Sequence, residues 1–280
     1  MEGVTEFQYR VPWRAVSCYP GSHLSIQRGS GYEVHGVAPL YAAGDPRRFD
    51  LRASLRDPFG RLLVRVFKQR SVVPVFVLAD VSASMSFVGH TCKFDLLTEF
   101  VTSLAYSTYR AGDLFAFSAC DSVIRDELSL PLTRARRAGT LVTERLRRWT
   151  PGGADAEGLL AGAEQVPGTR ALVFLISDFH LPVELVRLIL SRLSAHCVVP
   201  VVLIDSAEGR VPGTGLTRLY DPETRTRRSI FLRPSLARRL ENEQHDRSEQ
   251  LRSCLADYNL RPLYVIDKFE PEEVSRYFYG

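Results

Sequence analysis

The stretch VVPVFVLADVSASM, residues 72–85, decides the fold of this chain, because an apolar run passes directly into a polar loop. The first eight residues are apolar at consecutive positions, whereas a strand with one face in water would alternate apolar and polar residues. Continuous apolar runs are typical of strands that are buried on both faces of a parallel sheet. The stretch therefore predicts a central strand that leads into Asp80.

Four more apolar runs predict further strands, at residues 113–117, 171–177, 199–204 and 262–266. The run at 199–204 contains Pro200, and we expect the strand to begin at that residue because a proline is tolerated at the first position of a strand. Amphipathic patterns at 93–109, 182–194 and 235–258 predict helices between the strands. This alternation predicts an α/β fold with a doubly wound, mostly parallel sheet.

Residues 1–70 differ from the rest, because they hold many glycines and prolines, short alternating segments and no long helical period. They predict a β-rich N-terminal arm or subdomain, and residues 71–280 predict the α/β domain. Within that domain, alternating segments on either side of residues 221–224 predict a β-hairpin.

The composition is that of a globular protein, since 45% of the 280 residues are hydrophobic and 24% are charged. The apolar runs are far shorter than the ~20 residues of a membrane-spanning helix, and the N-terminus has acidic residues in place of the apolar core of a secretory signal. The five cysteines are scattered without C-x-x-C spacing, which argues against disulfides and a zinc site. We therefore expect a cytoplasmic protein without a membrane span.

Two of the predicted strands end in polar residues that suit a metal ion. Asp80, Ser82 and Ser84 form a D-x-S-x-S motif after the first strand, and Asp178 follows the strand at 171–177. Ligands of open α/β sheets bind at the carboxyl ends of the strands, so these oxygen atoms are expected to share one pocket. Hard oxygens with few formal charges suit Mg²⁺ or Mn²⁺. The alternative is that Asp80 or a serine only caps a helix, and His180 fits either the rim of the pocket or a capping position.

On these residues the chain resembles the von Willebrand factor A fold, whose metal-ion-dependent adhesion site combines D-x-S-x-S with a threonine from a separate loop and an aspartate. It resembles more specifically the DUF58 family of bacterial proteins. The matching motifs lie at residues 20–23, 28–33, 41–54, 80–85 and 176–179. One departure is Leu51, which stands where the family usually has tryptophan.

The resemblance implies a divalent cation, Mg²⁺ or else Mn²⁺ or Ca²⁺, held by Asp80, Ser82, Ser84, Asp155 and Asp178. A second departure concerns this site, because Ala154 stands where the family has the metal-binding threonine. Asp155 or Thr150 could substitute, a water could fill the position, or the metal affinity could be lower. In family members an acidic residue of the bound protein completes the metal's ligands, so this departure bears on partner affinity.

The resemblance implies a non-enzymatic protein-binding module that works with a MoxR-type AAA+ ATPase in chaperone-like maturation or metal insertion of a client protein. The chain is similar to the family's short soluble branch, some members of which accompany methanol dehydrogenase maturation genes. The alternative is a Mg²⁺-dependent phosphohydrolase with Asp80 as its nucleophile, although such enzymes generally have a second acid where Ser82 stands. Nucleic-acid binding by the arginine-rich residues 134–148 ranks last, because aromatic residues are not interleaved with those arginines.

Overall fold

The computed structural model describes residues 5–13, 20–29, 33–43, 45–153, 155–208, 215–221, 226–232 and 234–280. The chain separates into two compact units. One consists of Arg10–Val73 with Ala111–Asp113, and the other of Met1–Tyr9, Pro74–Arg110 and Leu114–Gly280. The division into an arm at residues 1–70 and an α/β domain at residues 71–280 stays a prediction.

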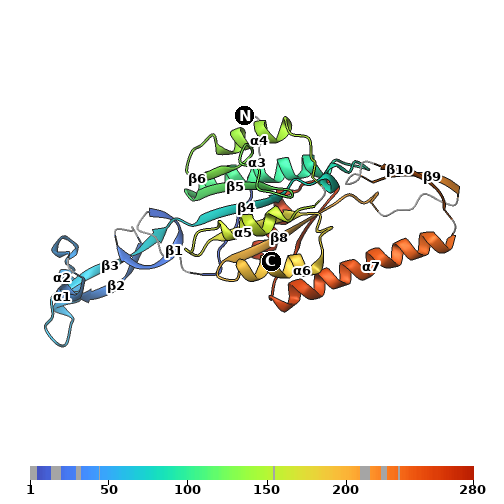
Figure 1. Cartoon of the computed structure of the whole chain (residues 1–280). Helices are drawn as coiled ribbons and strands as arrows, with labels where there is room; N and C mark the ends of the chain where they lie inside the picture. Colours follow the sequence, from blue (N-terminus) through green and yellow to red (C-terminus); the bar gives the residue numbers. More distant parts are fainter. Residues whose placement is uncertain are drawn as a thin grey trace. The chain divides into compact units, whose positions relative to one another are not determined.

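The larger unit is built on a six-stranded sheet with the order β11-β8-β7-β4-β5-β6 (Figure 1). Five strands are parallel: β4 (Pro74–Asp80), β5 (Leu114–Cys120), β7 (Leu172–Ser177), β8 (Cys197–Ile204) and β11 (Leu263–Ile266). The edge strand β6 (Leu130–Thr133) pairs antiparallel with β5. The predicted doubly wound, mostly parallel sheet is therefore confirmed, and β6 is the strand that apolar runs did not reveal, because two of its four residues are exposed.

The expected start of β8 at Pro200 is wrong, since the strand begins three residues earlier, at Cys197. Pro200 is paired with Leu175 of β7 in the strand interior. On the other side, β11 pairs with β8 only from Val201 onward. The proline therefore lies where β8 has a single neighbouring strand, which is the edge-like position that a residue without a backbone N–H tolerates.

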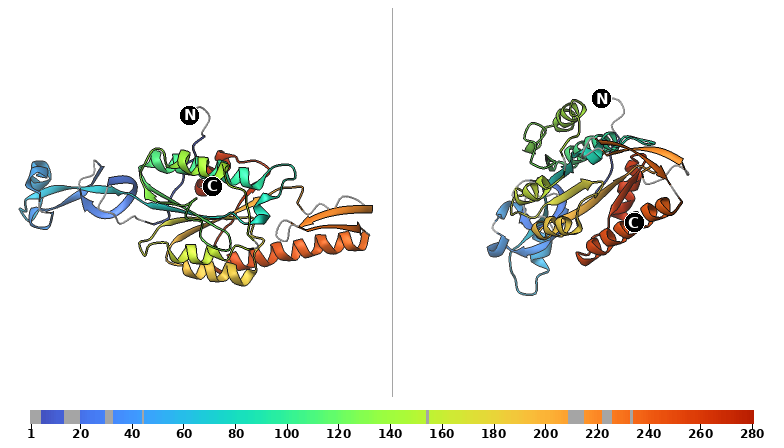
Figure 2. Two further views of the ribbon diagram at one scale, coloured as in Figure 1. Left: turned by 45° about the horizontal axis from the view of Figure 1, so that its top comes forward. Right: turned by 45° about the vertical axis from the view of Figure 1, so that its right-hand side comes forward.

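Helices cover both faces of the sheet. They are α3 (Lys93–Ala111), α4 (Ala138–Arg147), α5 (Gly158–Glu164), α6 (Val183–Arg192), α7 (Pro234–Asp257) and α8 (Pro271–Tyr279). On one face, Leu159 of α5, Ile189 of α6 and Leu255 of α7 pack in one buried cluster with strand residues. On the other face, Phe100 of α3 packs edge-on against Phe174 of β7, with ring centroids 5.8 Å apart. Figure 2 shows α3 and the α5–α6 pair on opposite faces of the sheet.

Two smaller sheets complete the fold. In the smaller unit, β1 (Pro20–Gly29), β3 (Leu63–Ser71) and β2 (Glu33–Pro39) form an antiparallel sheet, joined by the short helices α1 (Leu40–Ala43), η1 (Pro46–Arg48) and α2 (Leu51–Leu55). β9 (Gly215–Asp221) and β10 (Thr226–Leu232) pair antiparallel, which confirms the predicted hairpin. Its expected turn at 222–225 lies outside the described residues. None of the helices in the described part of the chain is long and apolar enough to cross a membrane.

Candidate functional site

Each of the five parallel strands delivers an aspartate to the same edge of the sheet. Asp80 is the last residue of β4, and the others follow their strands directly: Asp121 after β5, Asp178 after β7, Asp205 after β8 and Asp267 after β11. Sequence reasoning found Asp80 and Asp178 and missed the other three. Their signal was the same one, an acid directly after an apolar strand.

Asp80 and Asp178 lie where the strand order of the sheet reverses. From β4 the chain continues to β5 and β6 on one side, whereas from β7 it continues to β8 and β11 on the other. Ligands of open α/β sheets bind in the crevice at such a switch point. The two strand ends are also joined directly, because Ser177 Oγ donates a hydrogen bond of 2.7 Å to Asp80 Oδ2. The structure thus brings the two predicted acids to one place.

The Asp80 carboxylate carries a poorly compensated negative charge. The side chain is fully buried, and its hydrogen-bond donors are neutral groups of Ser82 and Ser177, among them the backbone N–H of Ser82 at 2.9 Å and the hydroxyl of Ser177. Burial and the nearby charge of Asp178 raise the pKa of Asp80 to about 6, against the hydrogen bonds from Ser82 and Ser177. A cation at this carboxylate would remove the penalty.

The aspartates after β5, β8 and β11 are already compensated. Arg125 Nη2 lies 2.7 Å from Asp121 Oδ2. Burial opposes the ionisation of Asp205, but backbone N–H donors lower its pKa to about 2; they belong to Gly89, His90, Thr91 and Ala207. The backbone N–H of Ser206 donates to Asp267 over 2.7 Å and lowers the pKa of that carboxyl. These three acids hold loops in place, and Asp80 differs from all of them.

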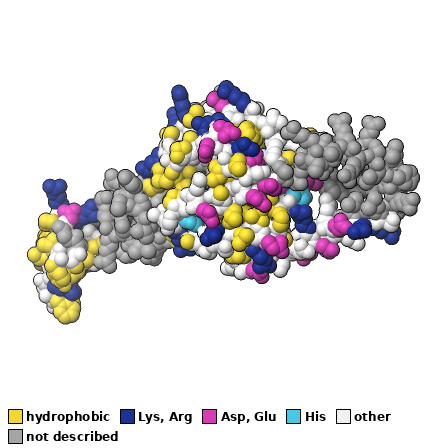
Figure 3. Space-filling view, viewed as in Figure 1, with side chains coloured by type: hydrophobic (Ala, Val, Ile, Leu, Met, Phe, Trp, Pro, Cys, Tyr) yellow, Lys and Arg dark blue, Asp and Glu magenta, His cyan; other side chains and the backbone are white. Residues whose placement is uncertain are grey.

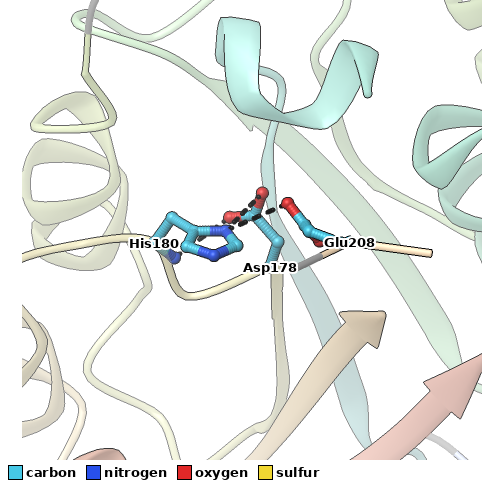
Figure 4. Close-up of side chains that lie close together, drawn as sticks. All are labelled: Asp178, His180 and Glu208. Atoms are coloured by element: carbon cyan, nitrogen blue, oxygen red, sulfur yellow. Dashed lines mark hydrogen bonds and ion pairs between the residues drawn. The ribbon is translucent and has the colours of Figure 1, made fainter. Parts of the chain in front are cut away.

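Asp178 belongs to a cluster with the buried Lys93 and the half-buried His180 and Glu208. Lys93 Nζ lies 2.6 Å from Asp178 Oδ2 and 2.8 Å from Glu208 Oε1, and His180 Nδ1 lies 3.1 Å from Asp178 Oδ2. Figure 4 shows His180 and Glu208 on the two sides of Asp178. Burial alone would raise the pKa of Asp178, but His180 and Lys93 lower it below its ordinary value. Sequence reasoning had no signal for Lys93 or Glu208, because both are far from Asp178 along the chain.

This cluster has the composition of a metal site, since ligand atoms of Asp178, His180 and Glu208 lie within 4.8 Å of one another. The Lys93 ammonium, however, already contacts both carboxylates. A metal ion that bound all three residues would have to displace a buried cation. The donor set around Asp178 therefore suits an ammonium group better than a divalent metal.

The serines of the D-x-S-x-S motif suit a small divalent cation. Ser82 Oγ and Ser84 Oγ are 3.2 Å apart. Two neighbouring ligands of an octahedral Mg²⁺ with bonds of 2.0–2.1 Å would be separated by roughly 3 Å. Ser82 precedes the short helix η2 (Ala83–Ser86), but its side chain makes no capping hydrogen bond. The hydroxyls of Ser82 and Ser84, together with the Asp80 carboxylate, form a set of hard oxygens that fits Mg²⁺.

The loop before α5 lies beside this motif. The backbone N–H of Ala83 donates to Gly153 O over 3.3 Å. Gly153 has a φ of +91°, and a Cβ there would lie 3.0 Å from the Asp121 Cβ, so a glycine is needed for this close approach. Asp155 is exposed and accepts a hydrogen bond from the backbone N–H of Glu157 over 3.1 Å. It lines the same groove as Ser82 and Ser84, whereas Ala154 lies outside the described residues.

Comparisons with known proteins show the family of this chain. A family model described as "Protein of unknown function DUF58" matches residues 39–250. A Paracoccus denitrificans protein, described as an uncharacterized protein in the moxR 3′ region, is 38% identical over 104 residues, which are 37% of this chain and 99% of the relative.

Similar solved structures have low sequence identity. A conserved hypothetical protein BatB from Bacteroides thetaiotaomicron is 12% identical, with a TM-score of 0.41, and the match covers 74% of this chain and 100% of BatB. Proximal thread matrix protein 1 from the mussel byssus, described with a zinc-occupied MIDAS motif, is 17% identical, with a TM-score of 0.35, and the match covers 47% of this chain and 38% of that protein.

Proposed function

Because the chain belongs to the DUF58 family, we propose that it is a non-enzymatic protein-binding module that docks onto an AAA+ ATPase of the MoxR type. The relative from the moxR 3′ region supports this partner, since the match covers 99% of that relative and 37% of this chain. The ATPase would supply the energy of ATP hydrolysis, and this module would connect it to a client protein. The client role that we propose is chaperone-like maturation or metal insertion, with methanol dehydrogenase as the client that the family's short soluble branch indicates.

The observation that carries the proposal is the buried Asp80 carboxylate beside two hydroxyl oxygens at the switch point of the sheet. In the proposed site, Asp80, Ser82 and Ser84 would hold Mg²⁺, with Asp155 at the edge of the same groove. One carboxylate and two neutral hydroxyls would leave the bound ion with net positive charge. An acidic residue of the partner is the ligand that such an ion attracts.

In this proposal Asp178 acts through its charge and not as a ligand of the metal. Lys93 and His180 offset most of the negative charge of Asp178. The charge that remains raises the pKa of Asp80. The partner's carboxylate therefore meets a cation whose charge is offset mainly by one acid. This arrangement favours docking that depends on the metal over a closed structural metal site.

The proposal is tested by capturing the MoxR-type ATPase of the same organism on the immobilised full-length protein, with Mg²⁺ or with EDTA. We expect capture in Mg²⁺, loss in EDTA, and loss for the Ser82→Ala/Ser84→Ala variant. Ser191→Ala is the matched control, since that exposed hydroxyl donates only to Leu188 O within α6. Equal capture by all variants with and without Mg²⁺ would contradict metal-dependent docking.

The enzyme alternative is tested with the same proteins. Hydrolysis of p-nitrophenyl phosphate by the purified chain, abolished by Asp80→Asn, would favour an aspartate-dependent phosphohydrolase. We expect no hydrolysis above that of the Asp80→Asn variant.

A further inference from the structure

A groove of about 1010 Å³ runs from Ser82 and Ser84 across the start of α6 to the middle of α7. Its volume is at the upper end of the range for small-molecule pockets, about 300–1,000 Å³. The walls come from the loop that holds Ser82 and Ser84, the loop before α5, the loop before α6, the first turns of α6 and residues 243–250 of α7. A groove of this size between helices suits a polypeptide segment.

The floor of the groove is apolar and partly open to solvent. It is lined by Leu181, Val183, Leu185 and Leu188. Leu188 is 51% exposed, although the next two residues of the same helix, Ile189 and Leu190, are buried. Figure 3 shows acidic side chains gathered around hydrophobic ones on the face that holds α5 and α6. Contiguous apolar surface that is rimmed by polar residues is typical of an interaction site.

The rim of the groove is strongly acidic, although the chain as a whole has a net charge of +4. Five acids line it: Asp155, Glu157, Glu184, Glu243 and Asp246. Glu243 pairs with Arg239 on its own helix, and the other four form no ion pair with any residue in the described part of the chain. Their charge is therefore available to an outside group.

Arg247 is the one arginine among the described residues that line the groove, and its single positive charge offsets only part of the charge of the five acids. Arg247 Nη2 donates to Leu181 O over 3.2 Å, which fixes α7 against the loop before α6. His180 is turned toward Asp178 and Glu208, so its interactions also lie inside the protein. The groove thus combines an apolar floor with an excess of negative charge at its rim. A complementary segment has apolar side chains for the floor and basic side chains for the rim.

We propose that this groove binds a basic amphipathic helix of the partner protein, whose apolar side chains contact Leu185 and Leu188 and whose Lys or Arg residues face the acids of α6 and α7. Helices that lay an apolar face into a groove are a recurring mode of peptide recognition. The inference rests on the proposed function in that the helix belongs to the protein that also supplies the metal's acidic ligand. The groove then determines which partner docks, because the cation alone attracts any carboxylate.

The test uses a fluorescein-labelled peptide of about 18 residues, or five helical turns. It carries leucines at i, i+4, i+7 and i+11 and lysines at the flanking positions, and a second peptide has glutamates in place of the lysines. Fluorescence anisotropy of the full-length protein is expected to show binding of the basic peptide only, weakening as the salt concentration rises. No binding of the basic peptide, or equal binding of both, would overturn the proposal.

Charge reversals locate the binding. Glu184→Lys/Asp246→Lys is expected to weaken the basic peptide about tenfold or more, since it replaces two attractive contacts by repulsive ones. The control is Asp126→Lys/Glu144→Lys, which reverses two exposed acids outside the groove and is expected to change the affinity less than twofold. Equal weakening by both variants would show a non-specific charge effect and overturn the assignment.

Two further measurements separate this inference from its alternatives. The basic peptide is also titrated in EDTA, where binding is expected to persist without the cation, so a failure of metal binding and a failure of the groove are distinguishable. Sedimentation of the protein alone is expected to show a monomer. Self-association that Glu184→Lys abolishes would instead assign the groove to a second copy of this chain and overturn the partner proposal.

Discussion

Lys93 Nζ and Asp178 Oδ2 are 2.6 Å apart, and both side chains are buried. The pair makes Asp178 different from Asp80, the acid at the end of the adjacent strand. The ammonium lowers the pKa of Asp178, whereas the neighbouring Asp80 has its pKa raised to about 6. The protein thus supplies a cation to one acid and leaves the other without one, and the predictions below follow from that asymmetry.

We expect Asp80→Asn to stabilise the metal-free protein at pH 8 by about 1–3 kcal/mol, because it removes a buried charge whose ionisation the fold opposes. The asparagine oxygen can still accept from Ser82 N. Asp205→Asn is the matched control, and we expect it to destabilise the protein, since backbone amides stabilise the Asp205 carboxylate. Urea denaturation measures both, and a less stable Asp80→Asn variant would contradict an uncompensated charge.

The pH dependence of stability follows from the same group. The pKa of Asp80 in the folded protein, about 6, is above its ordinary value of 3.8. The folded state therefore binds this proton more tightly than the unfolded state does, so the stabilising contribution is complete below pH 3.8 and is lost as the pH rises through 6. Comparing denaturation of the wild type and Asp80→Asn from pH 4 to 8 isolates it, and a stability difference independent of pH would refute the assignment.

The affinity for Mg²⁺ is expected to rise with pH, whereas the stabilising contribution of the Asp80 proton falls. A proton on Asp80 competes with the cation, so the apparent affinity should rise as the pH increases from 5 to 7 and level off above the pKa of about 6. Calorimetric titrations across this range measure the effect. An affinity that stays constant over the range would mean that Asp80 is not a ligand.

Removing the ammonium is expected to expose the cluster around Asp178. Lys93→Met leaves the buried Asp178 and the half-buried Glu208 without their shared ammonium, which should cost about 3–5 kcal/mol in urea denaturation. Added Mg²⁺ should recover part of the loss, because a divalent ion can take the vacated place. Lys268→Met is the control, since Lys268 is 75% exposed and solvent screens its pair with Glu270, so the substitution should be nearly neutral. A Lys93→Met protein as stable as the control would contradict the role of the buried pair.

The glycine of the loop before α5 gives a backbone test. Gly153→Ala places a Cβ 3.0 Å from the Asp121 Cβ at a φ of +91°, and we expect a loss of about 1–3 kcal/mol. Since this loop carries Asp155 to the groove, the Mg²⁺ affinity should also fall. Gly168→Ala adds a methyl group where no atom lies within 4 Å and should be nearly neutral. Equal effects of the two substitutions would show that the loop is not held by this contact.

Periodicity predicted the parts of the fold that bury apolar surface. The runs that became β4, β7 and β8 and the stripe of α3 needed only local information. The predicted start of β8 at Pro200 was wrong. A strand tolerates a proline according to which strand lies beside it, and that is a tertiary property. The acids after β5, β8 and β11 were visible, but their local role in holding loops could not be separated from a binding role without their hydrogen-bond donors.

The candidate site was predictable in its location and not in its charge balance. Asp80 and Asp178 were placed together from the rule for strand ends. Lys93 appeared only as the start of an amphipathic helix, and its contact with Asp178 joins residues 85 positions apart in the chain. The groove beside the serines depends on α7, whose position relative to α6 no sequence pattern specifies.

The most direct test of the central claim is a Mn²⁺ titration of the full chain followed by electron paramagnetic resonance, in which protein-bound Mn²⁺ loses the signal of the free ion. We predict one bound ion per chain for the wild type, competed by Mg²⁺, and none for Asp80→Asn at the same concentrations. Retention of the bound ion by Asp80→Asn, or no bound ion in the wild type, would contradict the claim that Asp80 and its two neighbouring serines hold a divalent cation.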